Sequence, residues 1–393
     1  MTHGPLRPVV DRVLRGFMRC ELVEHGFARL WCPTCRISVL CPFSCRGRNF
    51  CPSCEKKKQL LWAEWLQKEV LAPVPHRHVV LTMPRLLRPL FRRRRELLLD
   101  LGQCAAEAIA EYTRRGVVIE QARPGIVASI ATSGDLMQWP PPGHLLVTDG
   151  AFSDSGAFHP IASRDAEAVM TLFRERLLAR LLEGHAISEE LARRLLSWRH
   201  PGFSAHVGNA IPFEDKKAIE DVACYLVRAP LSLKKRVYLD GQKAVLYRSK
   251  MNPFLGRNFE AMDPLEWLAR LAEHISDAGK HRTHFYAYYA NRVRGQRSPE
   301  DGAGPKDETE APQKRRCTPS WAHLISKVYQ ADPLVCRKCG GPLKIVAYVT
   351  DDLSITRILD HLGLSPPRQD KPPPPRELVR VPVDDEGREI EAY

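Results

Sequence analysis

Residues 32–54 read CPTCRISVLCPFSCRGRNFCPSC, and this stretch decides how the N-terminal part of the chain can fold. It contains two Cys-x-x-Cys pairs, Cys32 with Cys35 and Cys51 with Cys54, separated by fifteen residues. Each pair presents two thiolates on one tight turn, and two such turns can surround a tetrahedral zinc ion. We therefore expect these four cysteines to bind one structural zinc ion, the alternative being a set of unrelated free cysteines.

The segment around these pairs is too short to fold without help. Residues 1–58 are basic and rich in cysteine, and a segment of this size cannot bury enough apolar surface on its own. A bound metal ion can supply the missing folding free energy. Three more cysteines lie nearby and could complete a second site or be buried thiols. Of Cys20, Cys41 and Cys45, we count Cys20 and Cys45 among the expected ligands.

Basic side chains flank the second pair. Arg46 and Arg48 precede it, and Lys56, Lys57 and Lys58 follow it. A run of charges is usually a solvated face, but a zinc-bound turn could hold this one against a phosphate backbone. We expect residues 1–58 to form a zinc-binding domain that contacts DNA through these five side chains.

The composition of the 393-residue chain is that of a globular protein, with 44% hydrophobic and 27% charged residues. Lys and Arg total 59 against 46 Asp and Glu, which gives a net charge of +13. A surplus of this size favours a polyanionic partner, because basic side chains release counterions from phosphates. DNA and RNA fit equally well at this level, so a ribosomal or ribonucleoprotein role stays open.

Apolar runs and cysteine usage indicate the compartment. The sequence has no run of about 18 apolar residues, so we expect no membrane span. Residues 1–10 lack the apolar core of a signal peptide. Seven of the twelve cysteines lie between Cys20 and Cys54, which in a reducing compartment indicates metal binding rather than disulfides. We expect a cytoplasmic protein.

Apolar periodicity predicts an α+β domain over residues 59–295. Short runs typical of strands occur at 78–83, 126–131, 144–148, 236–239 and 244–248, and an Asp-Gly turn joins the last two. Helical spacing of apolar residues predicts helices over 59–71, 86–115, 165–198, 217–228, 264–275 and 281–294. The four consecutive arginines Arg92–Arg95 should be exposed.

The remainder of the chain changes character after this domain. Residues 296–316 are polar and rich in Gly, Pro, Glu and Lys, as in a linker. A small module over 317–364 contains a third pair, Cys336 and Cys339. This pair could be half of a zinc ribbon or a metal-free turn. If it binds zinc, the further ligands could be Cys317, His323 or His361. A four-proline run and many charges predict a disordered tail over 365–393.

Three histidines deserve comparison as metal ligands. His76 and His78 alternate along a strand and share a face, but no acidic residue follows closely, which favours a surface or phosphate-contacting role. His144 begins the strand 144–148 without a second histidine beside it. Taken alone, it is more typical of a packed residue than of a ligand.

The segment 281–294 combines tyrosines with arginines. On the expected helix Tyr286 and Tyr289 share one face, whereas Tyr288 points away. Aromatic residues on a helix usually pack, yet neighbouring arginines attract phosphate and lower the pKa of a phenol from about 10. These tyrosines are therefore candidates for chemistry as well as for packing.

A series of motifs runs through residues 15–364. In order, they are SCRGRNFCPSC, HRHVVLTMP, LLVTDGAF, YLVRAPLSLKK, YRSK, MDPLEW, a tyrosine-containing segment ending in ANRVRG, and CTPSWAHLISKVYQADPLVCRKCGG. Together they resemble the transposases of insertion-sequence family ninety-one, which are relatives of rolling-circle replication initiators. The resemblance covers nearly the whole chain.

The resemblance implies an HUH endonuclease, in which an antiparallel sheet with flanking helices carries two histidines separated by one residue. These histidines hold magnesium or manganese, which polarises the scissile phosphate. A tyrosine from a facing helix attacks, leaving a 5′-phosphotyrosine and a free 3′-hydroxyl. The implied partner is single-stranded DNA at transposon ends, in the bacterial cytoplasm at the nucleoid, with no small-molecule substrate.

This sequence departs from the family pattern at the metal site. Residues 139–150 read WPPPGHLLVTDG where the family has a strand such as WHPHxHxLVTDG, so His144 matches the second histidine and Pro142 replaces the first. The family's segment RYYGWYSN matches residues 284–291, where its last tyrosine falls on Tyr289 and Tyr286 is a possible substitute. The resemblance thus implies Tyr289 as nucleophile and His144 as remaining ligand. A catalytically inactive DNA-binding remnant is the main alternative, and an RNA-binding zinc protein is a further one.

Overall fold

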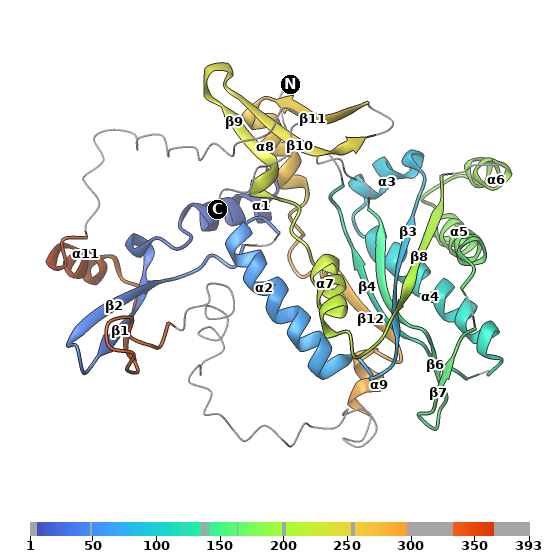
Figure 1. The fold of residues 1–393 in the computed structure, drawn as a ribbon. Helices are drawn as coiled ribbons and strands as arrows, with labels where there is room; N and C mark the ends of the chain where they lie inside the picture. The colour runs from blue at the N-terminus through green and yellow to red at the C-terminus, as the bar shows by residue number, and fades with distance from the viewer. Residues whose placement is uncertain are drawn as a thin grey trace.

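The computed structural model describes residues 6–364, except for residues 48, 120, 135–138, 140, 163, 199–201, 253–255 and 297–332. Arg48, most of the expected linker and the expected tail therefore lie outside the described residues. The described chain is a mixture of helices and antiparallel sheets (Figure 1). No described helix is both long enough and apolar enough to cross a membrane.

A five-stranded antiparallel sheet forms the centre of the molecule, in the order β12-β4-β5-β3-β8. Its strands are β3 (His76–Thr82), β4 (Gly125–Ile130), β5 (Gly143–Thr148), β8 (Ser204–Ile211) and β12 (Thr283–Ala287). Every residue of β4 and β5 is buried, because helices cover both faces of the sheet. The strands predicted at 78–83, 126–131 and 144–148 are confirmed.

Two strands of this sheet correct the sequence-based expectations. The strand β8 lies between the predicted helices 165–198 and 217–228, where no strand was predicted, and β12 lies within the segment 281–294 that was predicted to be a helix. The residues Thr283–Ala287 instead pair with β4 along their length, and only Asn291–Gly295 (α9) is helical. Thr, Phe and Tyr favour extended backbone, so pairing with a buried strand outweighs the helical spacing of the aromatic residues.

One face of the sheet is covered by α4 (Leu97–Val117) and α5 (Ala166–Glu183) (Figure 1). Val79 and Leu81 of β3 point into this layer and belong to the same apolar cluster as Phe173. The predicted helices 86–115 and 165–198 are each interrupted. The first divides into Arg85–Leu87, α3 (Arg88–Arg93) and α4, and the second into α5 and α6 (Glu189–Ser197), which Ser188 caps by accepting a hydrogen bond from Leu191 N–H at 3.2 Å.

The opposite face of the sheet carries α2 (Pro52–Trp65), the π-helical turn Leu66–Val70 and α7 (Lys216–Leu226) (Figure 1). Leu146 of β5 packs here with Ile219 of α7. The two helices are also joined directly, because the Gln59 amide donates a hydrogen bond to the Cys224 carbonyl. The helix starting near Cys51 is therefore part of the layer that covers the central sheet.

A second sheet, β11-β10-β9, lies above this layer and packs on α8 (Pro264–Glu273) and α1 (Pro8–Met18). Its strands are β9 (Arg236–Leu239), β10 (Ala244–Asn252) and β11 (Arg257–Met262), and the Asp-Gly turn predicted at 240–241 lies between the first two. The arginine run 92–95 is only partly exposed, since Arg95 donates to the Glu273 carbonyl at 2.7 Å and Arg92 pairs with the Glu273 carboxylate.

The two ends of the described chain share a third sheet, in the order β13-β1-β2. The strands are β1 (Phe27–Cys32), β2 (Ile37–Pro42) and β13 (Lys344–Val349), and α11 (Asp352–His361) follows β13. Register runs from Phe27 opposite Val349 to Trp31 opposite Lys344. The described part of the expected C-terminal module is thus continuous with the N-terminal zinc region. A small hairpin, β6 (Gly150–Phe152) with β7 (Phe158–Pro160), extends from the central sheet.

Gly125 allows an aromatic ring to pack flat on the central sheet. A Cβ atom at this position would overlap the ring of Tyr289, which is fully buried. We predict that Gly125→Ala lowers the free energy of unfolding by about 1–3 kcal/mol through overpacking. Urea denaturation followed by fluorescence measures this change. Gly241→Ala is the matched control, because no other described residue lies within 4 Å of a Cβ there. Equal destabilisation by both variants would contradict the prediction.

Candidate zinc and nuclease sites

Eight cysteines gather into two groups among the residues that the structure describes. One group contains Cys20, Cys45, Cys51 and Cys54, and the other contains Cys32, Cys35, Cys336 and Cys339. Within each group the four Sγ atoms lie within 4.8 Å of one another. The expectation that Cys32, Cys35, Cys51 and Cys54 share one ion is therefore wrong. The cysteines predicted as ligands do form four-thiol clusters, but each Cys-x-x-Cys pair has a different partner.

The first cluster lies where α1 ends and α2 begins. Its Sγ atoms are separated by 3.6 Å from Cys20 to Cys51 and from Cys45 to Cys54, and by 3.7 Å from Cys20 to Cys54. Four thiolates around zinc at about 2.3 Å stand roughly 3.8 Å apart, so these separations fit a tetrahedral ion. Cys51 is the N-cap of α2, so the positive end of the helix lies beside the cluster.

The second cluster joins residues that are about 300 positions apart in sequence. Cys32 ends β1, and its Sγ lies 3.6 Å from that of Cys339. Gly340 adopts a left-handed φ of +69° and donates a hydrogen bond to the Cys336 carbonyl at 2.8 Å, which closes the turn between the two C-terminal cysteines. Backbone hydrogen bonds from Cys339 and Lys338 lower the pKa of Cys336 to about 7, which favours the thiolate that a metal requires.

The basic residues beside the first cluster differ in whether an acidic side chain neutralises their charge. Lys57 forms an ion pair with Glu21 at 2.5 Å, and Lys58 lies 3.8 Å from the buried Glu55. Arg46 and Lys56 are exposed. Arg46 and Lys56 therefore present the less compensated charge for a phosphate, while Arg48 lies outside the described residues.

His144 lies on the face of the sheet that α7 covers. Its backbone is opposite Val80 of β3 and Ser129 of β4. The imidazole stacks on that of His78, with ring centroids 5.5 Å apart. Both His144 Nδ1 and His78 Nε2 are buried and have no hydrogen-bond partner in the part of the chain that the structure describes. Burial lowers the pKa of His144 to about 3 and that of His78 to about 4, so both rings are neutral near pH 7.

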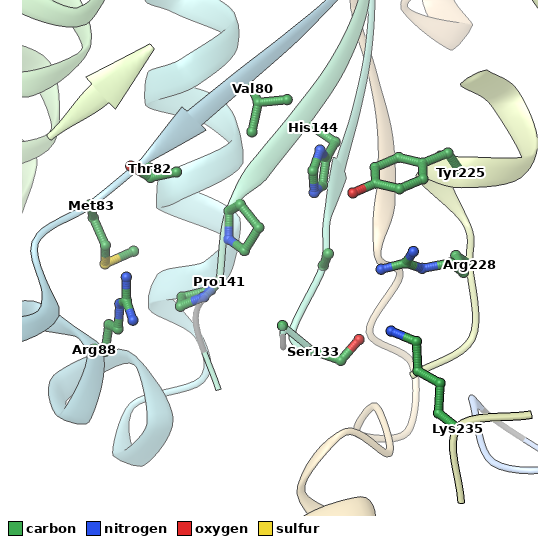
Figure 2. Close-up of a pocket in the computed structure, with 13 residues that line it drawn as sticks. Val80, Thr82, Met83, Arg88, Ser133, Pro141, His144, Tyr225, Arg228 and Lys235 are labelled. Carbon is green, nitrogen blue, oxygen red and sulfur yellow. The ribbon is translucent and has the colours of Figure 1, made fainter. Parts of the chain in front are cut away.

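Tyr225 of α7 faces these two imidazoles. Its ring centroid lies 5.1 Å from that of His144 and 5.6 Å from that of His78, and the side chain is 40% exposed. Figure 2 shows its hydroxyl pointing toward His144. Arg228 lies over the phenol ring, with its guanidinium carbon 4.8 Å from the ring centroid. A tyrosine, two imidazoles and a guanidinium thus meet at one place.

The position of Tyr225 follows from how α7 packs. Ile219, Ala223 and Leu226 recur at helical spacing and are buried against the sheet, which leaves Tyr225 at the edge of the contact. The buried hydroxyl of Ser129 donates a hydrogen bond to the Leu226 carbonyl at 2.6 Å and ties the end of the helix to β4. The motif YLVRAPLSLKK therefore contains a site tyrosine that the sequence analysis did not single out, although an exposed Tyr-x-x-Arg on an amphipathic helix was a usable signal.

A pocket of about 320 Å³ opens beside these side chains (Figure 2). Arg88, Arg228 and Lys235 contribute positive charge to its wall, and Pro142 lies in the wall near His144. No acidic side chain lines it within the described residues. A pocket with this charge suits a phosphate group.

The tyrosines predicted to be catalytic lie elsewhere. Tyr289 is fully buried at the far end of β3, where its hydroxyl is 2.7 Å from His76 Nε2 and accepts a hydrogen bond from Ala72 N–H at 3.1 Å. His76 is opposite Thr148, four residues along the register from the pair of Val80 and His144, or roughly 13 Å at the rise of a strand.

Tyr286 lies on the face that packs against α4, where burial raises its pKa to about 12. The arrangement supports neither tyrosine as a partner of His144.

Zinc binding by both clusters gives a testable stoichiometry. We predict about two zinc ions per wild-type chain, and about one after Cys336→Ser/Cys339→Ser or after Cys51→Ser/Cys54→Ser, because each double substitution removes two of four ligands. Metal analysis of the purified chain measures this.

Cys41→Ser is the matched control, since Cys41 lies on β2 outside both clusters. The first double variant should also make the C-terminal segment more sensitive to protease while sparing the central sheet. Retention of both ions in either double variant would refute the assignment.

Comparisons with known proteins agree with these features. A family model described as "Transposase zinc-binding domain" matches residues 1–83, and one described as "Putative transposase" matches residues 125–297. The chain is 28% identical over 375 residues to the transposase for insertion sequence element IS801 from Pseudomonas savastanoi pv. phaseolicola, covering 89% of this chain and 86% of that protein.

It is 25% identical over 317 residues to the putative transposase y4qJ from Sinorhizobium fredii, covering 75% and 78%. No solved structure matches. With both transposase models matched in order along the chain, the protein belongs to the transposases of insertion-sequence family ninety-one.

Proposed function

We propose that this transposase cuts and rejoins single-stranded DNA at transposon ends, with Tyr225 as the nucleophile. The observation that carries the proposal is the position of Tyr225, whose hydroxyl points toward His144 beside a basic pocket (Figure 2). A nucleophile, a positive cavity for the phosphate and a neutral imidazole are groups that can serve such a transfer.

The reaction is a transesterification. The Tyr225 oxygen attacks the phosphorus, the bond from phosphorus to the 3′ oxygen breaks, and the proton of the phenol ends on solvent or the departing oxygen. The products are a tyrosine 5′-phosphate and a free 3′-hydroxyl, and attack by a 3′-hydroxyl reverses the step. Arg88, Arg228 and Lys235 would stabilise the charge that develops on the phosphoryl oxygens.

The described residues fit a divalent cation at His144. Its buried Nδ1 has no hydrogen-bond partner, and the ring is neutral. A bound cation would act as a Lewis acid on the scissile phosphate. Manganese accepts imidazole nitrogen more readily than magnesium, which prefers oxygen ligands, so manganese should support cleavage better.

Single-stranded DNA suits the pocket better than a duplex does. The reacting groups lie at the edge of α7 and the sheet rather than on a protruding surface, and a single strand can bring one phosphate into such a pocket. The N-terminal zinc region, with exposed Arg46 and Lys56, would hold adjacent DNA and place the protein at the bacterial nucleoid.

The proposed covalent intermediate gives a testable prediction. Tyr225→Phe should abolish the covalent adduct between the protein and an oligonucleotide carrying the element's end, because the phenol oxygen is the attacking atom. Tyr289→Phe and Tyr286→Phe should keep it. Denaturing gels with manganese and a 3′-labelled strand detect the adduct, because the tyrosine 5′-phosphate stays on the fragment that carries the 3′ end. A 5′-labelled strand reports the released fragment.

Two results would decide against this assignment. An adduct that persists in Tyr225→Phe would move the nucleophile to another residue. Absence of any adduct from wild-type protein that still binds the same strand would favour the inactive DNA-binding alternative.

Phosphate binding in the pocket gives another testable prediction. Lys235→Ala should weaken binding of a single strand and reduce the slope of log affinity against log salt by about 0.7, the value for one phosphate contact on single-stranded nucleic acid. Lys217→Ala is the matched control, because Lys217 is exposed and pairs with Asp221 at 2.8 Å at the opposite end of α7. Fluorescence anisotropy over a salt series measures both. A slope that changes equally in both variants would contradict a role for the pocket.

A further inference from the structure

His78 is the side chain at this site to which neither the motif pattern nor the proposed chemistry gives a role. It lies on β3, one strand away from His144, and points to the same face of the sheet. Its ring contacts those of His144 and Tyr225, with centroids 5.5 Å and 5.6 Å away. His78 therefore belongs to the site by position.

One ring nitrogen of His78 and one of His144 are available to bind a further group. His78 Nε2 and His144 Nδ1 are both buried and lack hydrogen-bond partners among the described residues. Buried polar atoms are nearly always satisfied by protein, water or an ion, so this adjacent pair offers two nitrogens to a bound group. An ion bound by two ring nitrogens at about 2.1 Å holds those nitrogens roughly 3–4 Å apart, which is compatible with adjacent rings at this spacing.

The position that the family pattern assigns to a second imidazole cannot supply one here. Residue 142 is proline, and it lines the pocket two residues before His144, just ahead of β5. His78, which is opposite Leu146 in the register, reaches the His144 ring from the neighbouring strand. The geometry points to a cross-strand cation site in which His78 of β3 and His144 of β5 are the two imidazole ligands of a divalent transition-metal ion such as Mn²⁺.

This inference rests on the proposed function, because the ion it describes would be the one that serves the cleavage pocket. The surrounding charge sets a condition on binding. Arg88 and Arg228 face the same pocket, and no carboxylate lines it within the described residues. Two neutral imidazoles leave the ion's charge uncompensated, so a phosphate from the DNA strand must contribute before the ion binds tightly.

The test measures Mn²⁺ binding without cleavage. The full chain carries Tyr225→Phe, its cysteine clusters are loaded with zinc, and it is saturated with a short single strand. Electron paramagnetic resonance of free Mn²⁺ gives the dissociation constant, with the strand alone as background. In this chain His78→Gln and His144→Gln should each weaken Mn²⁺ binding at least about tenfold, since even outer-sphere partners of a metal contribute 10–100-fold.

A control and a rescue make the result specific. His284→Gln should leave the dissociation constant unchanged, because His284 lies on β12 and bonds the His281 carbonyl at 3.0 Å. The double variant His78→Gln/Pro142→His should recover Mn²⁺ binding, because residue 142 then offers an imidazole beside His144. Recovery also shows that loss of His78 leaves the chain folded.

Two outcomes would overturn the inference: no Mn²⁺ binding above the background of the strand, or binding by His78→Gln equal to that of the parent chain. The proposed function is tested independently, because the Tyr225 adduct is measured in chains that retain Tyr225. A chain that binds Mn²⁺ through both histidines yet forms no adduct at Tyr225 would support this site and refute the nucleophile.

Discussion

The packing of α7 against the central sheet determines which side chains can meet at the pocket. Ile219, Ala223 and Leu226 bury one stripe of the helix, and the Ser129 hydroxyl fixes the Leu226 carbonyl over β4. Ser129 is also directly opposite His144 in the register. This buried hydrogen bond therefore helps to hold α7, which carries Tyr225, against the strands next to His144. A small shift of α7 would move the Tyr225 ring away from the His144 imidazole.

The first cysteine cluster acts on the same helix layer from outside. Cys51 and Cys54 occupy the N-terminal turn of α2, and the side chain of Gln59 in the next turns donates to the Cys224 carbonyl, one residue before Tyr225. A zinc ion at this cluster would fix the start of α2 and, through it, the outer side of α7. The second cluster has a different consequence, because it ties β13 to β1 and so unites the two ends of the described chain.

The sequence predicted the local features of this protein better than its long-range partners. Three central strands, the Asp-Gly hairpin and the metal-binding character of the cysteine pairs follow from local spacing. The grouping of Cys32 with Cys339 depends on the pairing of strands far apart in sequence, which no local pattern contains. The segment with the tyrosines was predicted to be helical because its aromatic residues have helical spacing. Pairing with the open edge of β4 favours the extended form instead, and the buried ring of Tyr289 fills the space over Gly125.

Loss of a ligand at residue 142 need not mean loss of a two-imidazole site. On a β-sheet, one face is shared by alternate residues of a strand and by the neighbouring strands in register. A ligand beside His144 can therefore come from residue 142 on the same strand or from β3 alongside it. Proline closes the first route, whereas His78 lies on the second, and its Nε2 has no hydrogen-bond partner among the described residues. In the proposed cation site, His78 would therefore replace the ligand that the motif departure at residue 142 removes.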